Sequence, residues 1–388
     1  MPETAPERVG SAMPAPHTKR SRRLYEIDVL RILTFACVIG VHTTSHTVAS
    51  DDVVLYGVLG LLHFTREVFF ALTAFVLANS YYAKGGSFVR TIPRRLLLVA
   101  VPYVTWSVIY FAASNLRSPH YSLGAGTVAF LEHLVEGTAW YHLYFLLVTM
   151  QVYVLFPVFL WVVEKTRGRH VLLLSVTGAY QLAFTWFLRY RPLDLGSISH
   201  NPKSFFFTYL FFIFLGIVCA AHAAEFLAWV RAHRQAIAVI TGAALVGMVV
   251  YYIVSIDHGD SYYRAGTPLQ PVLMVWSVVV GLAFLAFGTW WADRRVSDSR
   301  LARAVTVVSD RSFGIFLAHP LALWVMLWIG GDWVEKHIST PLLTLVCYVV
   351  VILVAYGIST VARRTPVSLA LSGRPYRRAA KPLEPVAG

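Results

Sequence analysis

The chain has 388 residues, of which 57% are hydrophobic and 14% are charged. Soluble domains contain about a quarter charged residues, so this composition excludes an ordinary soluble protein and indicates a polytopic membrane protein. The formal net charge of +13 would suit a nucleic-acid-binding protein, but the placement of the charges described below argues against nucleic acid as a partner. Cys37, Cys219 and Cys347 stand alone in apolar runs, so we expect buried thiols and neither a disulfide framework nor a zinc site.

Residues 1–23 are polar, proline-containing and basic, which predicts a disordered cytoplasmic tail. Residues 24–362 form one predicted membrane domain, and residues 363–388 predict a second basic cytoplasmic tail. The membrane domain contains about ten apolar runs of the length that crosses a bilayer. They lie near 27–48, 57–82, 95–114, 140–163, 170–190, 204–222, 236–256, 269–291, 304–329 and 340–362. The fold class is therefore an all-α transmembrane bundle, in which the connection 115–139 contains a segment, VAFLEHLVEG, compatible with an interfacial helix.

The positions of the basic residues predict how the spans are oriented. With a cytoplasmic N-terminus, the tails and the even-numbered connections hold 24 Lys and Arg residues, and the outer connections hold 6. This asymmetry follows the positive-inside rule and predicts a plasma-membrane protein with both termini in the cytoplasm. The positive charge also gives the inner face an affinity for anionic lipid headgroups or for an anionic ligand.

Ionisable residues inside spans are costly, so each one is expected to have a partner or a function. His42 follows Arg31 by 11 residues, which places it about 16 Å further along a helix and on the same face. The ionisable residues therefore fall into two polar layers. The inner layer holds Asp28, Arg31, Asp310, Arg311 and the basic segment 84–95, which includes Arg90, Arg94 and Arg95. The deeper layer holds His42, His46, His63, Arg66, Glu67 and His319.

This arrangement predicts the transfer of a group at a site within the membrane. A basic inner layer suits an anionic donor from the cytosol, and a deeper histidine with a carboxylate suits proton transfer. We therefore expect a group to move from a cytosolic carrier to a site within the membrane.

Several of these residues also have a purely structural interpretation. Asp28 and Arg31 are spaced as an ion pair on one helix, and Arg66 and Glu67 could lock two helices together. His46 could simply face the outer water.

The remaining alternatives concern the proline-linked histidine, the arginine pair and metals. His319 precedes Pro320 and could satisfy backbone groups that the proline frees. Arg94 and Arg95 could be plain positive-inside anchors. A zinc site built on the HTTSH segment lacks the glutamate of the His-Glu-x-x-His motif, so we predict no metal.

The same segments resemble the acyltransferase-3 family of integral membrane O-acyltransferases. YEIDVLRILTFACVIGVHTT is similar to the first span of that family, which carries Arg or Lys, ten residues, and then His, here Arg31 and His42. FTREVFFALTAFVLANSYY, RTIPRRLLLVAVPYVTW and WYHLYFLLVTMQVYVLFPVF resemble the next three spans, and FFTYLFFIFLGIVCA and FGIFLAHPLAL resemble later ones. The chain differs in having Thr73-Ala74 where the family often has Ser-Gly, and Leu98 where it has a second spaced arginine.

The resemblance implies transfer of an acyl group, commonly acetyl, from acyl-coenzyme A to a hydroxyl, without a tightly bound cofactor. The implied acceptors are glycans, lipid-linked sugars or glycosylated natural products. His42 would act as general base or carry the acyl group, and Glu67 would orient it. Arg66 would stabilise the oxyanion. Coenzyme A would meet the inner basic residues Arg31, Arg90, Arg94 and Arg95 with Asp28, while His63, Arg66, His319 and Arg311 would support the acceptor or lie behind the site.

Two other functions fit the same residues. A proton-coupled exporter or flippase would use His42 and Glu67 as a proton relay. A non-catalytic subunit of a glycan synthase complex would use neither. Many family members carry a fused extracytoplasmic hydrolase-like domain, so we expect this chain, with about 25 residues after the last span, to act alone or with a partner. Membrane lipids and a further copy of the chain are the other expected partners.

Overall fold

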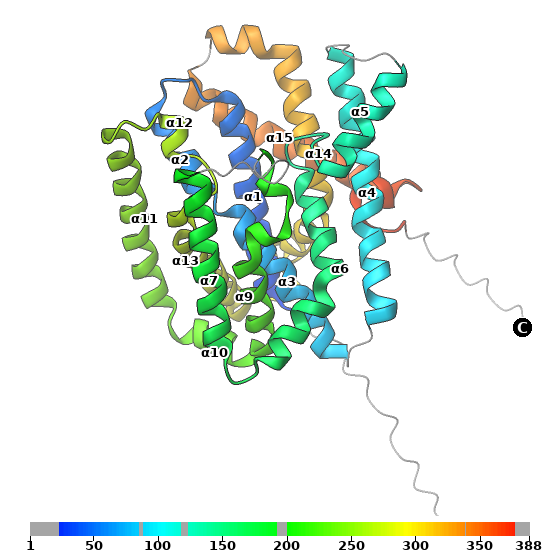
Figure 1. Cartoon of the computed structure of the whole chain (residues 1–388). Coiled ribbons are helices and arrows are strands. Elements are labelled where there is room, and N and C mark those ends of the chain that lie inside the picture. The colour runs from blue at the N-terminus through cyan, green and yellow to red at the C-terminus, as the bar shows by residue number, and fades with distance from the viewer. Residues whose placement is uncertain (1–22, 85–87, 118–122, 192–199, 338, 377–388) are drawn as a thin grey trace, which may run out of the picture.

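The computed structural model describes residues 23–84, 88–117, 123–191, 200–337 and 339–376. Within these ranges the chain is helical and contains no strand, which confirms the predicted all-α class (Figure 1). The predicted N-terminal tail lies outside the described residues except for Arg23, as does the end of the C-terminal tail from residue 377.

Nine helical stretches among the described residues are long and apolar enough to cross a membrane. A tenth candidate is a pair of helices bent by 94°, so the predicted number of about ten spans is confirmed. The nine are α1 (Tyr25–Thr47), α2 (Val53–Leu62) with α3 (Thr65–Lys84), α4 (Phe88–Arg117), α6 (Tyr144–Lys165), α7 (His170–Tyr190), α11 (Arg234–Asp257), α13 (Pro271–Arg294), α14 (Arg300–His337) and α15 (Thr340–Ala362), and the bent pair is α9 (Leu210–Ala221) with α10 (Ala223–Ala232).

Two predicted spans are interrupted. The second is broken between α2 and α3, where the His63 side chain donates from Nδ1 to the Gly266 carbonyl oxygen, 2.8 Å away. The sixth is preceded by a 3-10 turn, η1 (Pro202–Ser204), begins with a second one, η2 (Phe206–Tyr209), and bends sharply at His222. The remaining short helices are α5 (Leu123–Glu136), in the region compatible with an interfacial helix, α12 (Tyr262–Ala265) and α16 (Ser368–Ser372).

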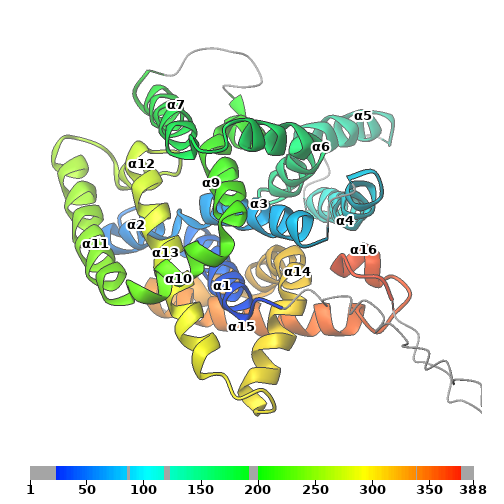
Figure 2. The same cartoon turned by 90° about the horizontal axis from the view of Figure 1, so that it is seen from below.

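Helix α1 is the centre of the bundle. It packs against α2, α3, α13, α14 and α15, and the view along the helices shows it surrounded by its neighbours while α11 and α5 lie at the periphery (Figure 2). Glycines allow the closest approaches: a side chain at Gly288 of α13 would meet the backbone of Glu26, and one at Gly216 of α9 would meet the backbone of Ala71. Small residues at such contacts are the usual means of packing helices in a membrane.

Packed structure continues past the last span. α16 lies against α4, α14 and α15, and the Trp106 indole of α4 donates to the Leu371 carbonyl oxygen at 3.3 Å. Gly373 ends α16 with a positive φ of 64°, a conformation that glycine adopts easily. α16 and this turn belong to the predicted C-terminal tail, so part of that tail packs against the bundle.

Candidate active site

One cavity of about 370 Å³, which we call the histidine cavity, opens between α1, α3, the start of α6 and the segment 263–268. Four of the described histidines line it together with two cationic side chains. These residues are His42, His46, His63, His142, Arg66 and Lys203.

The His42 ring lies between aromatic neighbours. Its centroid is 4.6 Å from that of Tyr141 and 5.3 Å from that of His319. Tyr141 also lies 4.9 Å from His46, whose Nδ1 donates to the His42 carbonyl oxygen at 2.8 Å. These contacts fix the two imidazoles of α1, and His42 is half-buried whereas His46 is exposed.

His142 is a site residue that the sequence reasoning missed. It is 1% exposed, and its ring centroid is 5.7 Å from that of His319. Both of its ring nitrogens are buried and have no hydrogen-bond partner among the described residues. The Nε2 of His319 is also unpartnered, while its Nδ1 lies 2.6 Å from the Phe316 carbonyl oxygen. Buried polar atoms without partners are costly and point to a ligand or a function. The WYHLYF segment already singled out for its resemblance contained the available signal.

Arg66 and Glu67 form a buried ion pair at the edge of the histidine cavity. Arg66 donates to Glu67 Oε1 at 3.2 Å, and Arg66, not Glu67, lines the cavity. The predicted contact between Glu67 and His42 is absent from the described hydrogen bonds, because the carboxylate is turned to its neighbour in sequence. Glu67 therefore balances and holds the Arg66 guanidinium.

Lys203 completes the positive rim of this cavity. Its ammonium lies 5.2 Å above the Tyr144 ring. Burial lowers the pKa of Lys203, and the charge of Arg66 lowers it further. The cavity thus combines imidazoles with cationic groups at its edge.

A second cavity of about 370 Å³, which we call the arginine cavity, lies between α1, α3, α4, α6, α14 and the turn after α16. Of the residues that the structure describes, three arginines line it, Arg31, Arg95 and Arg374, against a single carboxylate, Asp310. Hydroxyl groups of Thr149, Tyr153 and Ser309 face the same space. Arg374 had no signal in the sequence beyond its basic surroundings, and the turn at Gly373 brings it to the cavity.

Asp28 stands behind the arginine cavity and does not line it. Its carboxylate accepts from Ser309 Oγ at 2.8 Å and from Arg23 Nε at 2.6 Å. It lies 3.7 Å from the Arg31 guanidinium, which also reaches Ser309 Oγ at 3.4 Å. The i, i+3 pair of the sequence interpretation is thus present, and it orients Arg31 rather than competing for a ligand.

The other predicted cationic residues have different places. Arg94 is exposed beside the half-buried Arg95 and does not line the cavity. Arg311 turns to α15, where it donates to Thr360 Oγ1 at 3.0 Å and lies over the Tyr356 ring. Arg90 falls within α4, but its side chain lies outside what the structure describes.

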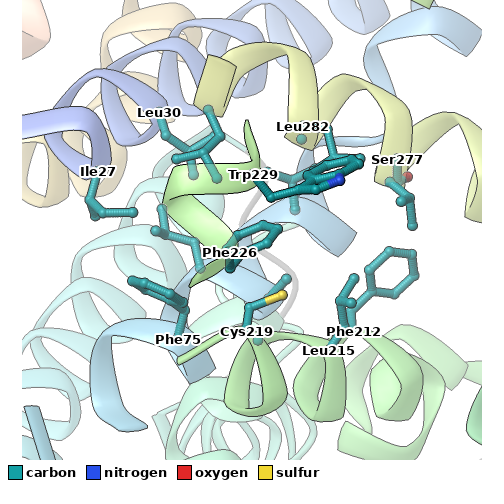
Figure 3. A pocket seen from close by; sticks show the side chains of 17 residues that line it. Ile27, Leu30, Phe75, Phe212, Leu215, Cys219, Phe226, Trp229, Ser277 and Leu282 are labelled. Carbon is teal, nitrogen blue, oxygen red and sulfur yellow. The ribbon is translucent and has the colours of Figure 1, made fainter. Parts of the chain in front are cut away.

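A third cavity, of about 300 Å³, is almost wholly apolar. Figure 3 shows Phe226 and Trp229 of α10 closing it on one side and Phe75 and Cys219 on another. Ser277 is the only hydroxylic side chain that lines it, and no charged side chain does so among the described residues. A phosphate-bearing ligand has no counter-charge there, so the arginine cavity is the better place for an anionic donor.

Comparison with known proteins assigns the chain to one family. The model of the acyltransferase-3 family, described as an acyltransferase domain, matches residues 24–360. No curated protein and no solved structure matches the chain. Within the described ranges, no three His, Cys, Asp or Glu side chains are grouped as they would be around a metal ion.

Proposed function

The chain belongs to the acyltransferase-3 family and is a multi-pass membrane acyltransferase. We propose that it transfers a short acyl group, most often acetyl, from cytosolic acyl-coenzyme A to a hydroxyl of a glycan or glycoside. One observation carries this proposal. Helix α1 places Arg31 in a cavity rich in arginine and His42 in a cavity rich in histidine, about 16 Å apart along the helix.

The arginine cavity suits the phosphates of coenzyme A. Guanidinium groups pair with phosphate oxygens bidentately, and Asp28 with Ser309 holds Arg31 in position for such a pair. The pantetheine arm is roughly 15–20 Å long when extended, by comparison with an extended peptide of similar bond count. An arm of that length reaches from Arg31 to His42.

The histidine cavity suits the chemistry and the acceptor. His42 would take the proton of the acceptor hydroxyl as its oxygen attacks the thioester carbonyl carbon. The resulting oxyanion would be stabilised by Arg66, which Glu67 positions. When the carbon–sulfur bond breaks, the proton held by His42 goes to the coenzyme A thiolate, so that the products are the ester and the free thiol. Tyr141 and Tyr263 line the same space, and aromatic rings of this kind stack on sugars.

The donor site can be tested without knowing the acceptor. Wild-type protein in lipid nanodiscs is titrated calorimetrically with coenzyme A, and Arg31→Lys is compared with it. We expect binding to weaken about tenfold in the variant, because lysine cannot form the bidentate contact. An absence of binding, or equal affinity of the two proteins, would contradict the assignment of the arginine cavity.

The transfer itself is tested by incubating the same protein with acetyl-coenzyme A and a panel of oligosaccharides and glycosides. Mass spectrometry then detects the addition of one acetyl group. An acetylated product separates the enzyme from an exporter or a non-catalytic subunit, which would give none.

A further inference from the structure

Four phenylalanines separate the histidine cavity from the arginine cavity. Phe69 and Phe145 line both cavities, Phe35 lines the arginine cavity, and Phe316 lines the histidine cavity. We call Phe35, Phe69, Phe145 and Phe316 the phenylalanine layer. Phe35, Phe145 and Phe316 are at most 6% exposed. The four phenylalanines come from four different helices: α1, α3, α6 and α14.

The rings of the layer form a closed circuit of contacts. Their centroids are 5.0 Å apart from Phe35 to Phe69, 4.3 Å from Phe69 to Phe145, 5.2 Å from Phe145 to Phe316, and 5.6 Å from Phe316 back to Phe35. Aromatic rings at these distances touch one another. This ring circuit therefore lies between the two cavities, with Phe69 and Phe145 lining both.

The same pattern recurs on each helix of the layer or, for α6, at its start. A polar residue in or near the histidine cavity is paired with a phenylalanine that lies closer to the arginine cavity. The two are about one turn apart on α3, α6 and α14 and about two turns apart on α1. The four pairs are His42 with Phe35, Arg66 with Phe69, His142 with Phe145, and His319 with Phe316. The phenylalanines thus lie at one level between two polar levels.

This level must be crossed if the proposed function is right. Along α1, Phe35 lies about 6 Å beyond Arg31 and about 10 Å short of His42. A donor whose phosphates rest on Arg31 can bring its thioester to His42 only by passing the phenylalanine layer. Without such a seal, two polar cavities would also offer water and ions a path through the membrane.

We propose that the phenylalanine layer is a gate for the pantetheine arm of acyl-coenzyme A: the four rings close the passage when it is empty and part for the slender arm. This inference rests on the proposed function. The contacts between rings are weak and reversible one by one, and none of the four rings carries a polar group that would bind the arm in place.

The test follows the arm itself with the pyridyl disulfide of coenzyme A, which cannot cross a bilayer. It is added to inverted membrane vesicles, which expose the cytoplasmic face, in a background with Cys37, Cys219 and Cys347 replaced by alanine. A reporter is placed in the histidine cavity as His42→Cys. Its thiolate attacks the sulfur of coenzyme A, pyridine-2-thione leaves, and intact-mass measurement detects the mixed disulfide. A second reporter, Thr73→Cys, lies in the arginine cavity.

Variants of the layer then change the passage in both directions. With the His42→Cys reporter, Phe69→Leu and Phe316→Leu should each speed labelling on the order of tenfold, as expected when aromatic contacts are removed. Phe35→Trp should slow it. The matched control is Phe159→Leu on α6, a buried ring in contact with Phe206 and Phe214 that lines neither cavity, and it should leave the rate unchanged.

The outcomes separate the gate from the proposed function. Labelling of Thr73→Cys without labelling of His42→Cys would retain the donor cavity and overturn the gate. Equal labelling rates of His42→Cys in the three layer variants and in the Phe159→Leu control would also overturn the gate. If neither reporter reacts, the donor site of the proposed function is wrong and the gate falls with it.

Discussion

The arginine cavity and the histidine cavity share α1 and have about the same volume, but they handle charge in different ways. Permanently charged Arg31 keeps a quarter of its side chain exposed and has Asp28 beside it. The histidine cavity holds imidazole groups that can be neutral, and the one guanidinium among its described lining residues, Arg66, is balanced by Glu67. A permanent charge is cheap only near water, whereas a neutral imidazole tolerates depth. In the proposed function, the cost of desolvation would therefore separate donor binding from proton transfer along one helix.

The largest expected effect concerns the side of the membrane that each cavity faces, because labelling of a single cysteine from outside the cell is all or none. Ser261, before α12, lies near the histidine cavity, and Arg167 follows α6 on the other side. In intact cells, a membrane-impermeant maleimide should label Ser261→Cys and not Arg167→Cys, as the positive-inside rule requires. Permeabilised cells should label both. Labelling of Arg167→Cys in intact cells would place the arginine cavity on the outer face and remove the cytosolic donor.

The next largest effect is expected at His42. His42→Ala should lower acyl transfer at least about 10²-fold, the usual contribution of a general base. Its affinity for coenzyme A should be unchanged, because Arg31 lies in the other cavity. The matched control is His258→Ala, an exposed histidine at the end of α11. Retention of more than about a tenth of the activity would show that His42 is not the base.

The buried ion pair predicts opposite effects on stability and on activity. Glu67→Leu leaves the Arg66 guanidinium buried without a counter-charge and should cost about 3 kcal/mol of stability. The double variant Arg66→Met with Glu67→Leu should recover most of that loss, because apolar residues can replace a buried pair. It should remain inactive, because the oxyanion loses its donor.

Thermal unfolding in detergent and the rate of acetyl transfer measure the two quantities. A double variant with normal activity would leave Arg66 and Glu67 with a structural role alone.

The smallest effect distinguishes two neighbouring arginines. Arg95→Gln should raise the KM for acyl-coenzyme A about fivefold, because Arg95 lines the arginine cavity, and leave the acceptor KM unchanged. Arg94→Gln should change it less than about twofold, and high salt should remove even that, because exposed charges are screened. Equal effects of the two substitutions would favour the alternative that both arginines are only topological anchors.

The fold followed from the sequence because hydrocarbon imposes one simple requirement. A segment that crosses a bilayer must satisfy its own backbone hydrogen bonds and must be apolar for about 20 residues. These conditions are local, so the spans could be placed from hydropathy. The break at His63 and the bend after α9 could not, because they depend on contacts with Gly266 and with the neighbouring helices.

The candidate site divides in the same manner. The alignment of Arg31 with His42 is a property of one helix and was visible in the spacing of the residues. The pairing of Arg66 with Glu67 was also offered by the sequence, as neighbours on one helix. That this pairing would replace the expected contact between Glu67 and His42 could not be seen, because these two residues lie on different helices. The same holds for His142 and His319, which lie far apart in the sequence and meet only because α6 packs near α14.

The order of the residues was enough to establish the class of the protein, the number of its spans and the helix that carries both Arg31 and His42. Which cationic groups share a cavity depended on how the helices pack: the turn at Gly373 brings in Arg374, and Arg311 points away to α15. The same packing also closed the phenylalanine layer with one ring from each of four helices. The physical reason is that hydrophobic burial and helical periodicity act over a few residues, whereas a cavity is defined by the packing of helices that the chain connects only distantly.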